Sequence, residues 1–301
     1  MRVFVTGATG WIGSAVVPEL LAAGHEVVGL ARSDTSAEAL TAAGARAHRG
    51  SLDDVDALRA AAADADGVIH LAFDHAAAFA GDFATAAARD RTAIAALAEG
   101  LTGTGRPLVI ASGLAGHPSG RVVTEEDAPD LTTHAGERMR AERAVLDLAA
   151  SGVRSVSVRL SPSVHGAGDT GFAALLVQIA RERGVVGDGA NTWPAVHRSD
   201  AAKLFRLALE DAPAGTVLHG AAEEGVPLRA VAEAIGAQLD LPAVSVASAD
   251  AAEHFGWFAT FVQIDVRASS ARTRALLGWE PTGPTLLEDL EAGRYTQVPV
   301  G

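Results

Sequence analysis

Short apolar runs alternate with amphipathic stretches through the first half of the chain. Several of these runs are apolar nearly throughout, as expected of parallel β-strands that are covered on both faces. The predicted strands are Arg2–Thr6, Glu26–Ala31, Ala45–His48, Gly67–Ala72, Pro107–Ser112 and Arg154–Leu160. Helical patterns lie between them, over Trp11–Ala23, Ser36–Ala43, Val55–Ala63, Phe83–Leu101 and Ala135–Ala150. This alternation predicts right-handed β-α-β units and a doubly wound parallel sheet, an α/β fold.

The regular alternation ends after Leu160, where loops rich in Gly, Pro, Asp and Asn begin. The helices predicted beyond this point are Phe172–Glu182, Ala201–Glu210, Leu228–Leu239, Ser269–Leu277 and Leu286–Gly293. We therefore expect two domains. The first covers residues 1–168 and is completed by part of 195–222, and the second is a smaller mixed domain over 169–301. Gly24, Gly44 and Gly152 stand where helices of the first domain are expected to end.

The composition is that of a globular chain and excludes several kinds of partner. Of the 301 residues, 49% are hydrophobic and 20% are charged, which is sufficient for a sizeable core. A formal net charge of −13 repels nucleic acid and anionic lipid, so neither is an expected partner. The chain has no Cys, which excludes disulfides and thiolate chemistry. His and carboxylate residues do not cluster with metal-ligand spacing, so no metal is expected.

The N-terminus leads directly into the first predicted strand, without the apolar region and cleavage site of a signal peptide. No apolar run approaches the roughly 20 residues that a membrane span requires. We expect a cytoplasmic location.

A glycine-rich turn follows the first predicted strand. It reads Thr6-Gly7-Ala8-Thr9-Gly10-Trp11-Ile12-Gly13 and opens the first helix. Glycine permits a sharp turn, a close approach of the backbone to a pyrophosphate, and tight packing of helix on strand. The helix N-terminus adds free N–H groups and the positive end of its dipole. The position within a β-α-β unit favours a dinucleotide site over the alternative, an ordinary strand–helix turn.

The residue after the second strand indicates which dinucleotide is bound. Sites that prefer NAD usually carry an acidic residue here, which holds the ribose 2′-hydroxyl. This chain has Arg32 instead, placed to meet a 2′-phosphate. A solvated Arg is the alternative, and we favour NADP(H) as the cofactor.

Several further segments resemble those of the extended short-chain dehydrogenases/reductases, a family with a Rossmann-type fold. Thr6–Gly13 resembles the family's TGxxGxxG fingerprint, and Leu277–Pro281 resembles its C-terminal LGWxP motif. The other similar segments are Gly50–Asp54 (GDLxD, with Ser51 in place of Asp), Val68–Ala72 (VIHLA), Val109–Gly113 (the strand that ends in the catalytic Ser or Thr), Val158–Gly166 (LRPxxVYG) and Pro194–Asp200 (VHVDD).

The resemblance implies a set of cofactor-binding residues. They are Gly7, Thr9, Gly10, Trp11, Ile12 and Gly13 in the first turn, Arg32, Ser51 and Leu52 near the adenosine, Leu71, Ala72 and Phe73 near the ribose, and Arg138, Pro162, Ser163 and Val164 near the nicotinamide. Two helices, around 83–101 and 135–150, resemble the pair that forms a four-helix interface in this family, so we expect a homodimer.

The catalytic Tyr of the family, with a Lys four residues later, is missing. The chain's single Tyr is Tyr295 and its single Lys is Lys203, and neither can form the motif. The family also has a Glu four residues after the Lys. Matching Glu142 to that position places His134 at the Tyr position and Arg138 at the Lys position.

We expect His134 to act as the acid, aided by Ser112, and Arg138 to hold the ribose. The alternative is that His134 is a loop residue and Arg138 a surface residue. Loss of general acid catalysis costs about 10²–10⁴-fold in rate. Holding hydride donor and acceptor together is worth roughly 7–11 kcal/mol, so a reductase could survive the loss.

Other polar and aromatic residues are candidates with a simpler structural reading beside the functional one. Asp74 and His75 line the pocket or are solvated loop residues, and His197 belongs to the core or to the pocket. The resemblance implies that His165, in the place of a Tyr, faces the nicotinamide region. Asp200 reads as a helix N-cap. Trp193, Trp257 and Phe258 form either an apolar substrate wall or part of the core.

Three functions compete. The first is an NADPH-dependent reductase acting on a small organic carbonyl, imine or activated alkene. The second is a non-catalytic NADP(H) sensor, which would explain the missing Tyr and Lys. The third is a nucleotide-sugar epimerase or dehydratase, which needs a strong base at the Tyr position and is disfavoured by this sequence.

Overall fold

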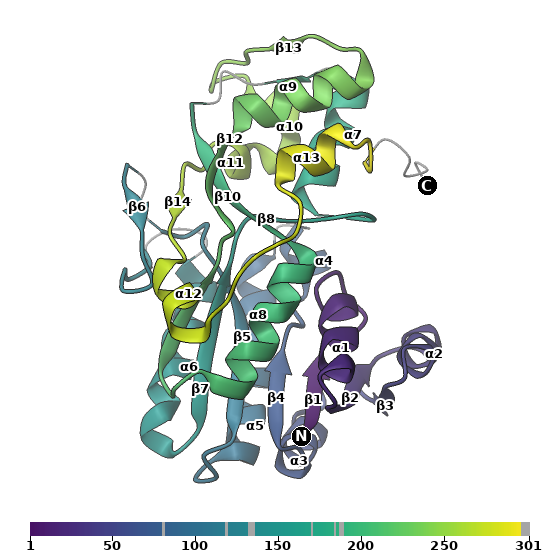
Figure 1. Cartoon of the computed structure of the whole chain (residues 1–301), viewed down its shortest axis with the longest axis vertical. Helices are drawn as coiled ribbons and strands as arrows, with labels where there is room; N and C mark the ends of the chain where they lie inside the picture. Colours follow the sequence, from purple (N-terminus) through teal and green to yellow (C-terminus); the bar gives the residue numbers. More distant parts are fainter. Residues whose placement is uncertain are drawn as a thin grey trace.

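The computed structural model describes residues 1–79, 82–117, 120–131, 136–169, 171–183, 185–186 and 190–295. Figure 1 shows a large sheet with helices in front and behind, and a smaller group of strands and helices above it. No helix in the described ranges is long and apolar enough to cross a membrane.

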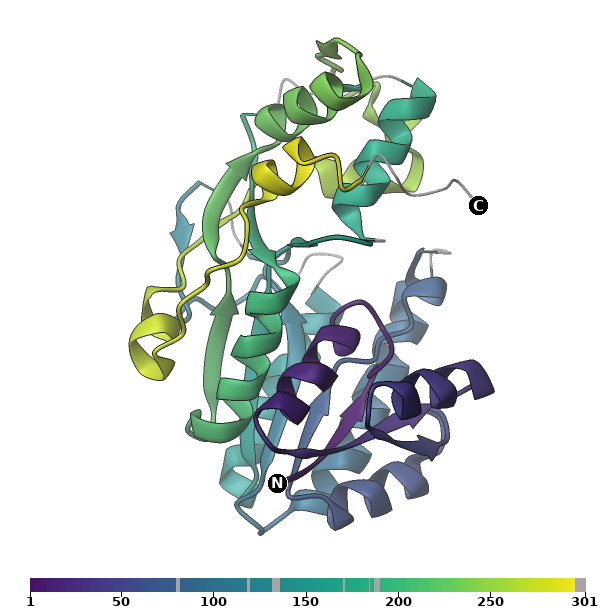
Figure 2. The same cartoon turned by 45° about the vertical axis from the view of Figure 1, so that its right-hand side comes forward.

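The large sheet has seven strands, and all of its pairings are parallel. In spatial order they are β3 (Arg46–Arg49), β2 (Glu26–Ala31), β1 (Arg2–Thr6), β4 (Gly67–His70), β5 (Pro107–Gly113), β7 (Arg154–Leu160) and β11 (Thr216–Gly220). The predicted doubly wound α/β sheet of the Rossmann type is confirmed. Because every strand runs the same way, the loops after the strands meet at one edge, and that edge faces the smaller group (Figure 2).

Two apolar clusters cover the two faces of this sheet. Successive residues of β1 alternate between them, since Val3 and Val5 belong to one cluster and Phe4 to the other. The first cluster includes apolar residues of α1 (Gly13–Ala22), α2 (Asp34–Ala42) and α8 (Arg198–Asp211). The second includes those of α3 (Val55–Asp64), α5 (Phe83–Leu101) and α6 (Gly136–Asp147). The sheet is therefore buried on both sides, which explains its nearly continuous apolar strands.

Most predicted elements of the first half appear within one or two residues of their expected bounds. The predicted helix over 135–150 is divided into α6 and a 3₁₀ turn, η1 (Leu148–Ser151). Gly24, Gly44 and Gly152 have φ of 83°, 88° and 72°, so each takes the left-handed conformation expected at a helix end. A short helix, α4 (His75–Phe79), follows β4 and was not predicted.

The smaller group contains a mixed three-stranded sheet. Its central strand β10 (Thr192–His197) runs parallel to β8 (Ser163–His165) and antiparallel to β12 (Glu223–Pro227). The surrounding helices are α7 (Phe172–Arg183), α9 (Leu228–Leu239), α10 (Ala251–Phe255), η2 (Gly256–Phe258), α11 (Ala259–Val262) and α13 (Leu286–Glu291). Two minor pairs complete it, β9 (Val185–Val186) with β13 (Ala243–Val244) and β6 (Val122–Val123) with β14 (Arg267–Ala268).

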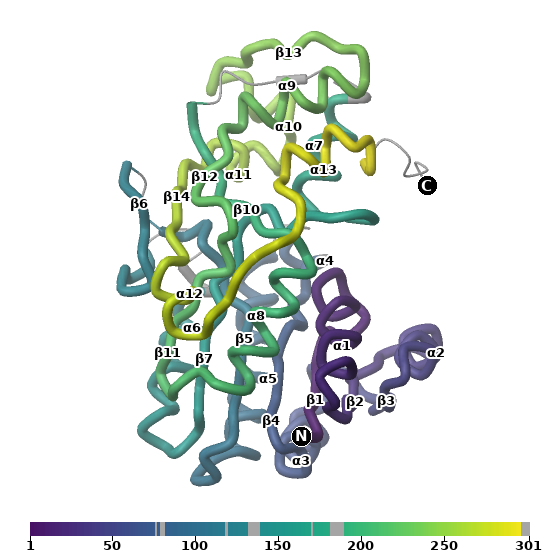
Figure 3. The backbone as a smooth tube through the Cα atoms, viewed as in Figure 1, coloured from purple at the N-terminus to yellow at the C-terminus, as the bar shows by residue number. Residues whose placement is uncertain are grey.

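The chain passes back to the large sheet before it ends. Helix α12 (Ala271–Leu277) lies beside α8 and β11, and the following segment runs back up past α8 to α13 (Figure 3). Trp279 of the LGWxP motif is fully buried, and its Nε1 donates to the carbonyl of Asp200 in α8. This motif thus anchors the returning segment to the large sheet domain.

A buried ion pair fixes α6 on the sheet. Arg159 in β7 donates from Nη2 to Glu142 Oε1 at 2.6 Å and from Nε to both carboxylate oxygens at 3.0 Å. The hydroxyl of Ser157 donates to Glu142 Oε2 at 2.7 Å. Burial alone would raise the pKa of Glu142, but the hydrogen bonds and charge of Arg159 outweigh it and lower that pKa.

Replacing Glu142 by Ala should destabilise the protein by about 3–5 kcal/mol, because the Arg159 guanidinium would be left buried without its partner. Urea unfolding monitored by circular dichroism measures this change. Glu38→Ala is the control, since Glu38 is exposed on α2, and it should cost well under 1 kcal/mol. A loss below about 1 kcal/mol for Glu142→Ala would contradict the role given to the pair.

Candidate cofactor site and active site

The first turn has the geometry that its glycines predicted. Gly7 has φ +66°, and a Cβ there would lie 2.7 Å from the Ala72 nitrogen. A Cβ at Gly13 would lie 2.0 Å from the Gly7 oxygen, so α1 packs directly on the turn. At Gly10 the added Cβ would meet only the Gly7 oxygen, at 3.2 Å. The turn is tightly packed at Gly7 and Gly13 and has space beside Gly10. This arrangement fits a site where backbone N–H groups bind the phosphates of a dinucleotide.

Trp11 joins this turn to the smaller sheet. Its Nε1 donates to the carbonyl of Val164 in β8 at 2.7 Å. The guanidinium of Arg198, the first residue of α8, lies 4.1 Å from the centroid of the Trp11 ring. Two residues predicted to bind the cofactor, Trp11 and Val164, are therefore in direct contact.

A buried polar chain supports the turn from within the sheet. Asp90 of α5 accepts from His70 Nε2 at 3.0 Å, and His70 Nδ1 lies 2.7 Å from the Thr6 hydroxyl. Because a carboxylate only accepts, Nε2 carries a proton, and in the neutral imidazole Nδ1 then accepts from the Thr6 hydroxyl. Thr6 Oγ1 in turn accepts from the Ala72 nitrogen at 3.3 Å. The chain holds the 71–73 segment beside Gly7. Asp90 was not predicted from the sequence. It could have been recognised as a carboxylate on an otherwise apolar face of α5, because a buried carboxylate requires a polar partner.

The residues predicted to bind the adenosine and ribose of the cofactor lie in the loops that follow β2, β3 and β4. Ser51 donates from its backbone nitrogen and its hydroxyl to Asp54 Oδ2, at 2.7 and 3.2 Å, which shapes the turn after β3. Leu52 packs against the second core cluster. Phe73 lies edge-on to His75, with ring centroids 5.1 Å apart.

Arg32 stands exposed after β2, and no described residue accepts a hydrogen bond or forms an ion pair with it. The nearby carboxylate of Asp74 is engaged by Arg89, whose Nη1 lies 2.5 Å from Asp74 and whose Nε lies 2.8 Å from Asp53. The hydrogen bond from the Ala77 nitrogen, together with Arg89 and Arg32, lowers the pKa of Asp74. Asp74 is thus an ion-pair partner of Arg89 rather than a solvated loop residue.

The predicted catalytic residues are only partly described. Ser112 is the last residue but one of β5, is buried, and donates to the Met139 sulfur of α6 at 3.8 Å. Arg138 belongs to α6, one turn before Glu142, and its side chain lies outside the described part of the chain. His134 lies entirely outside it. The acid role of His134 and the ribose role of Arg138 stay predictions, as does the homodimer.

The single Tyr and single Lys have other roles. The hydroxyl of Tyr295 accepts from the Gly166 nitrogen at 3.2 Å, and the ring is buried. Burial raises the pKa of Tyr295 far above its ordinary value. Lys203 lies on α8, where its Nζ donates to the Glu280 carbonyl. Neither side chain takes the family's catalytic position on α6.

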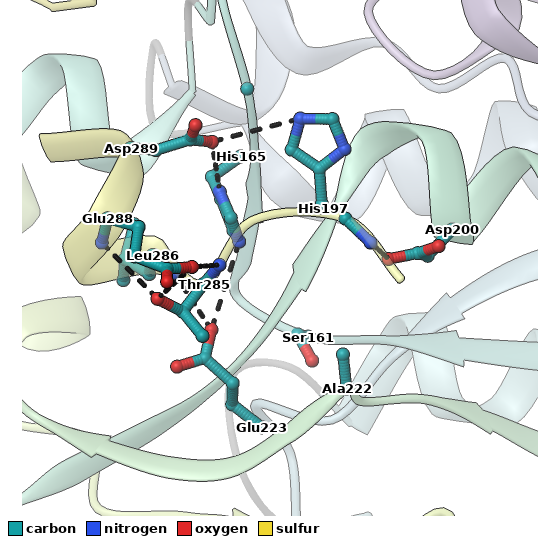
Figure 4. Close-up of polar contacts among 12 residues, drawn as sticks. Ser161, His165, His197, Asp200, Ala222, Glu223, Thr285, Leu286, Glu288 and Asp289 are labelled. Atoms are coloured by element: carbon teal, nitrogen blue, oxygen red, sulfur yellow. Dashed lines mark hydrogen bonds and ion pairs between the residues drawn. The ribbon is translucent and has the colours of Figure 1, made fainter. Parts of the chain in front are cut away.

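The loop after β7 differs in part from expectation. Ser163 is buried, and His165 is fully buried with its Nδ1 2.7 Å from Asp289 Oδ2 of α13. Figure 4 shows that His165 and His197 both turn toward Asp289, and that Glu223 lies on the other side of the His165 ring. The expectation that His165 faces the nicotinamide is wrong, because the buried Asp289 carboxylate binds it on the α13 side.

The expectation for Asp200 needs correction, and burial decides between the two alternatives left open for the aromatic residues. Asp200 is not the N-cap of α8, since that position belongs to His197. The Asp200 carboxylate instead accepts from the backbone nitrogens of Thr282 and Gly283, at 3.0 and 2.8 Å, and holds the returning segment. Trp193 and Phe258 are 1% and 0% exposed and belong to the core of the smaller group, whereas Trp257 is 47% exposed. Of the three aromatics, only Trp257 presents much surface.

Asp169 adds a titrating group to the loop between β8 and α7. Burial raises its pKa to about 6, against the opposing effect of hydrogen bonds from the Gly171 nitrogen and the Tyr295 hydroxyl. The folded chain therefore binds this proton more tightly than the unfolded chain, where the carboxyl has an ordinary pKa of 3.8. Burial of the charged carboxylate therefore destabilises the folded protein, and this cost is fully present above pH 6. The cost is removed as the pH falls from about 6 to 4 and the carboxyl becomes protonated.

Asp169→Asn should accordingly make the protein more stable than wild type above pH 6, by roughly 1–3 kcal/mol, with a smaller gain near pH 4. Asn retains an oxygen acceptor for the Gly171 nitrogen. Urea unfolding at pH 4.5 and pH 7.5 measures the difference. An advantage that is equal at both pH values would show that Asp169 does not titrate in this range.

Comparison with known proteins places the chain in a family. Residues 3–219 match the model of the NAD dependent epimerase/dehydratase family. An uncharacterized protein of Schizosaccharomyces pombe is 45% identical over 305 residues, which cover 98% of this chain and 100% of the relative. A 3-diazoavenalumate denitrifying reductase of Streptomyces is 31% identical, over 96% of this chain and 99% of the relative. A 4-hydroxy-2-methyl-3-oxo-4-farnesyl-3,4-dihydroquinoline-1-oxide ketoreductase of Stigmatella aurantiaca is 28% identical, over 94% and 88%.

Solved structures share the fold at lower identity. The crystal structure of UDP-glucose 4-epimerase from Thermotoga maritima superposes with a TM-score of 0.78 at 19% identity and covers 99% of both chains. The strand order, the glycine turn and the family match over residues 3–219 agree. The chain is a member of the NAD dependent epimerase/dehydratase family, the extended short-chain dehydrogenases/reductases, whose members bind NAD(P).

Proposed function

We propose that this protein is a reductase that uses NADPH to reduce a small organic carbonyl, imine or activated alkene. The observation that carries the proposal is the open glycine turn together with the exposed Arg32 after the neighbouring strand, which pairs with no residue in the part of the chain that the structure describes. The turn offers backbone donors to a diphosphate, and Arg32 offers a guanidinium to a 2′-phosphate. Two relatives that span nearly the whole chain carry reductase names, which supports the reaction class.

NADPH supplies a hydride when it is bound at this edge of the sheet. The chain's own residues supply position and, for some substrates, a proton. Gly7 and Gly13 keep the turn compact. The hydrogen bonds that link Thr6, His70 and Asp90 hold the 71–73 segment beside that turn. Such positioning is worth roughly 7–11 kcal/mol, more than the approximately 3–5 kcal/mol of acid catalysis.

The missing Tyr restricts the chemistry. Reduction of a neutral carbonyl adds a hydride to carbon and a proton to oxygen, and we assign the donation of that proton to His134, aided by Ser112. An iminium ion accepts the hydride without a proton, and an activated alkene can take its proton from water. Epimerisation of a sugar needs a base at the Tyr position. Tyr295 is buried against Gly166 and cannot serve, so the likeness to an epimerase structure concerns the fold alone.

A second candidate function is a non-catalytic NADP(H) sensor, which the missing Tyr and Lys favour. A sensor binds NADPH and never oxidises it, whichever substrate is offered. Turnover of NADPH with panels of ketones, imines and enones therefore separates the two functions.

Arg32→Ala should weaken NADPH binding about 10- to 100-fold and leave NADH binding nearly unchanged, because only NADPH carries the 2′-phosphate. Titration of cofactor fluorescence gives both affinities. Arg46→Ala is a matched control, since Arg46 is exposed at the opposite end of β3 and pairs with Glu26. Tighter binding of NADH than NADPH to the wild type would refute the choice of cofactor.

His134→Phe should lower turnover of a carbonyl substrate about 10²-fold and leave NADPH affinity intact. The pH–rate profile should also lose its step near the imidazole pKa, about 6.5. Unchanged turnover would mean that water or another group donates the proton. If Arg138→Ala also leaves cofactor affinity intact, the match of this segment to the Tyr/Lys motif is wrong.

A further inference from the structure

Arg198 lies against the glycine turn although it comes from a distant part of the chain. It is the first residue of α8, directly after β10. Its guanidinium carbon lies 4.1 Å from the centroid of the Trp11 ring, and Trp11 stands between Gly10 and Gly13. The smaller sheet thus delivers a cation to the turn that is open toward a phosphate.

The stack fixes Arg198 without using its hydrogen-bond donors. The Trp11 ring is itself held, because its Nε1 donates to the Val164 carbonyl at 2.7 Å. A guanidinium stacked on an aromatic face keeps its five N–H groups free in its own plane. The side chain is therefore oriented in advance, which lowers the entropy lost when it binds a ligand.

No described residue accepts a hydrogen bond from Arg198 or pairs with it as an ion. The side chain is half-buried, so the absence of a partner is costly. The charge of Arg198 acts on Asp169, but that carboxyl accepts instead from the Gly171 nitrogen and the Tyr295 hydroxyl. An anion beside the turn would supply the missing partner.

Another arginine of the same helix shows the contrast. Arg206 lies further along α8 and pairs with Glu19 at 2.7 Å and with Glu210 at 2.6 Å. An Arg that stabilises this helix is thus matched by carboxylates of the chain, and Arg198 is not. In the segment similar to VHVDD, Arg198 also stands where that pattern has Val, so the cation is a departure from the family pattern.

We propose that Arg198 binds the diphosphate of the nicotinamide cofactor, together with the backbone of the glycine turn. This inference rests on the cofactor binding of the proposed function. The diphosphate is favoured over the 2′-phosphate because Arg198 stacks on a residue of the turn itself, whereas Arg32 follows the neighbouring strand β2. NADH and NADPH share the diphosphate, and only NADPH has the 2′-phosphate, so the two arginines have different expected effects.

The test compares Arg198→Met, Arg198→Ala and Arg32→Ala in titrations of the full chain with NADPH and with NADH. Arg198→Met keeps an unbranched chain over Trp11 and removes the charge. Both Arg198 variants should weaken the binding of both cofactors by a similar factor of about 10 or more, since each loses a charge-assisted hydrogen bond to the shared diphosphate. Arg32→Ala should change the ratio of the two affinities.

Arg229→Ala is the matched control for loss of one positive charge, because Arg229 is exposed on α9 and pairs only weakly within its helix. It should bind both cofactors like the wild type, and thermal unfolding should confirm that every variant is folded.

Wild-type affinity in Arg198→Met would overturn the inference and leave Arg198 as a packing residue for Trp11. A loss confined to NADPH would also overturn it, by assigning Arg198 to the 2′-phosphate. If the wild type binds neither cofactor, this inference and the proposed function both fail. If the wild type binds both cofactors but never oxidises NADPH, the reductase proposal fails while the role of Arg198 stands on the binding data.

Discussion

The close approach of the first turn to the end of β4 is the constraint on which the site depends. Gly7 takes a left-handed conformation, and any side chain there would overlap the backbone of Leu71 and Ala72. Gly13 lets α1 begin directly against the turn. This contact therefore sets how α1 and the 71–73 segment are arranged at the edge of the sheet where the loops after the parallel strands meet.

Polar groups inside the sheet and aromatic contacts above it hold that arrangement. Within the sheet, Thr6, His70 and Asp90 form a chain in which each buried polar atom has a partner, and fully satisfied networks of this kind rigidify their surroundings. Above it, Trp11 joins the turn to β8 and to Arg198. The smaller group of strands and helices therefore contacts the glycine turn directly, through Trp11, in addition to its covalent connections to the large sheet.

This protein has buried contacts that stabilise its fold, but it lacks the Tyr and Lys of the family's catalytic motif. Glu142 and Arg159 still join α6 to β7 in a buried ion pair, and the LGWxP tryptophan still anchors the returning segment. The catalytic Tyr and Lys on α6 are gone. Helix α6 is thus held on the sheet by its buried ion pair although it carries neither a Tyr nor a Lys.

Local signals in the sequence determined the large sheet, its helices and the glycine turn. Strands apolar throughout, helices of period 3.6 and glycines at helix ends all act within a few residues, so the printed sequence is sufficient to find them. The same holds for Arg32, whose place after β2 follows directly from the strand pattern.

Only the tertiary structure decided the pairings between distant residues. His165 is bound by Asp289, Asp200 holds the 282–283 backbone, and Arg198 stacks on Trp11. These pairs are brought together by short strands of the mixed sheet and by the returning C-terminal segment, which carry no periodic pattern, and the partner of a buried polar side chain is set by the packing of whole elements.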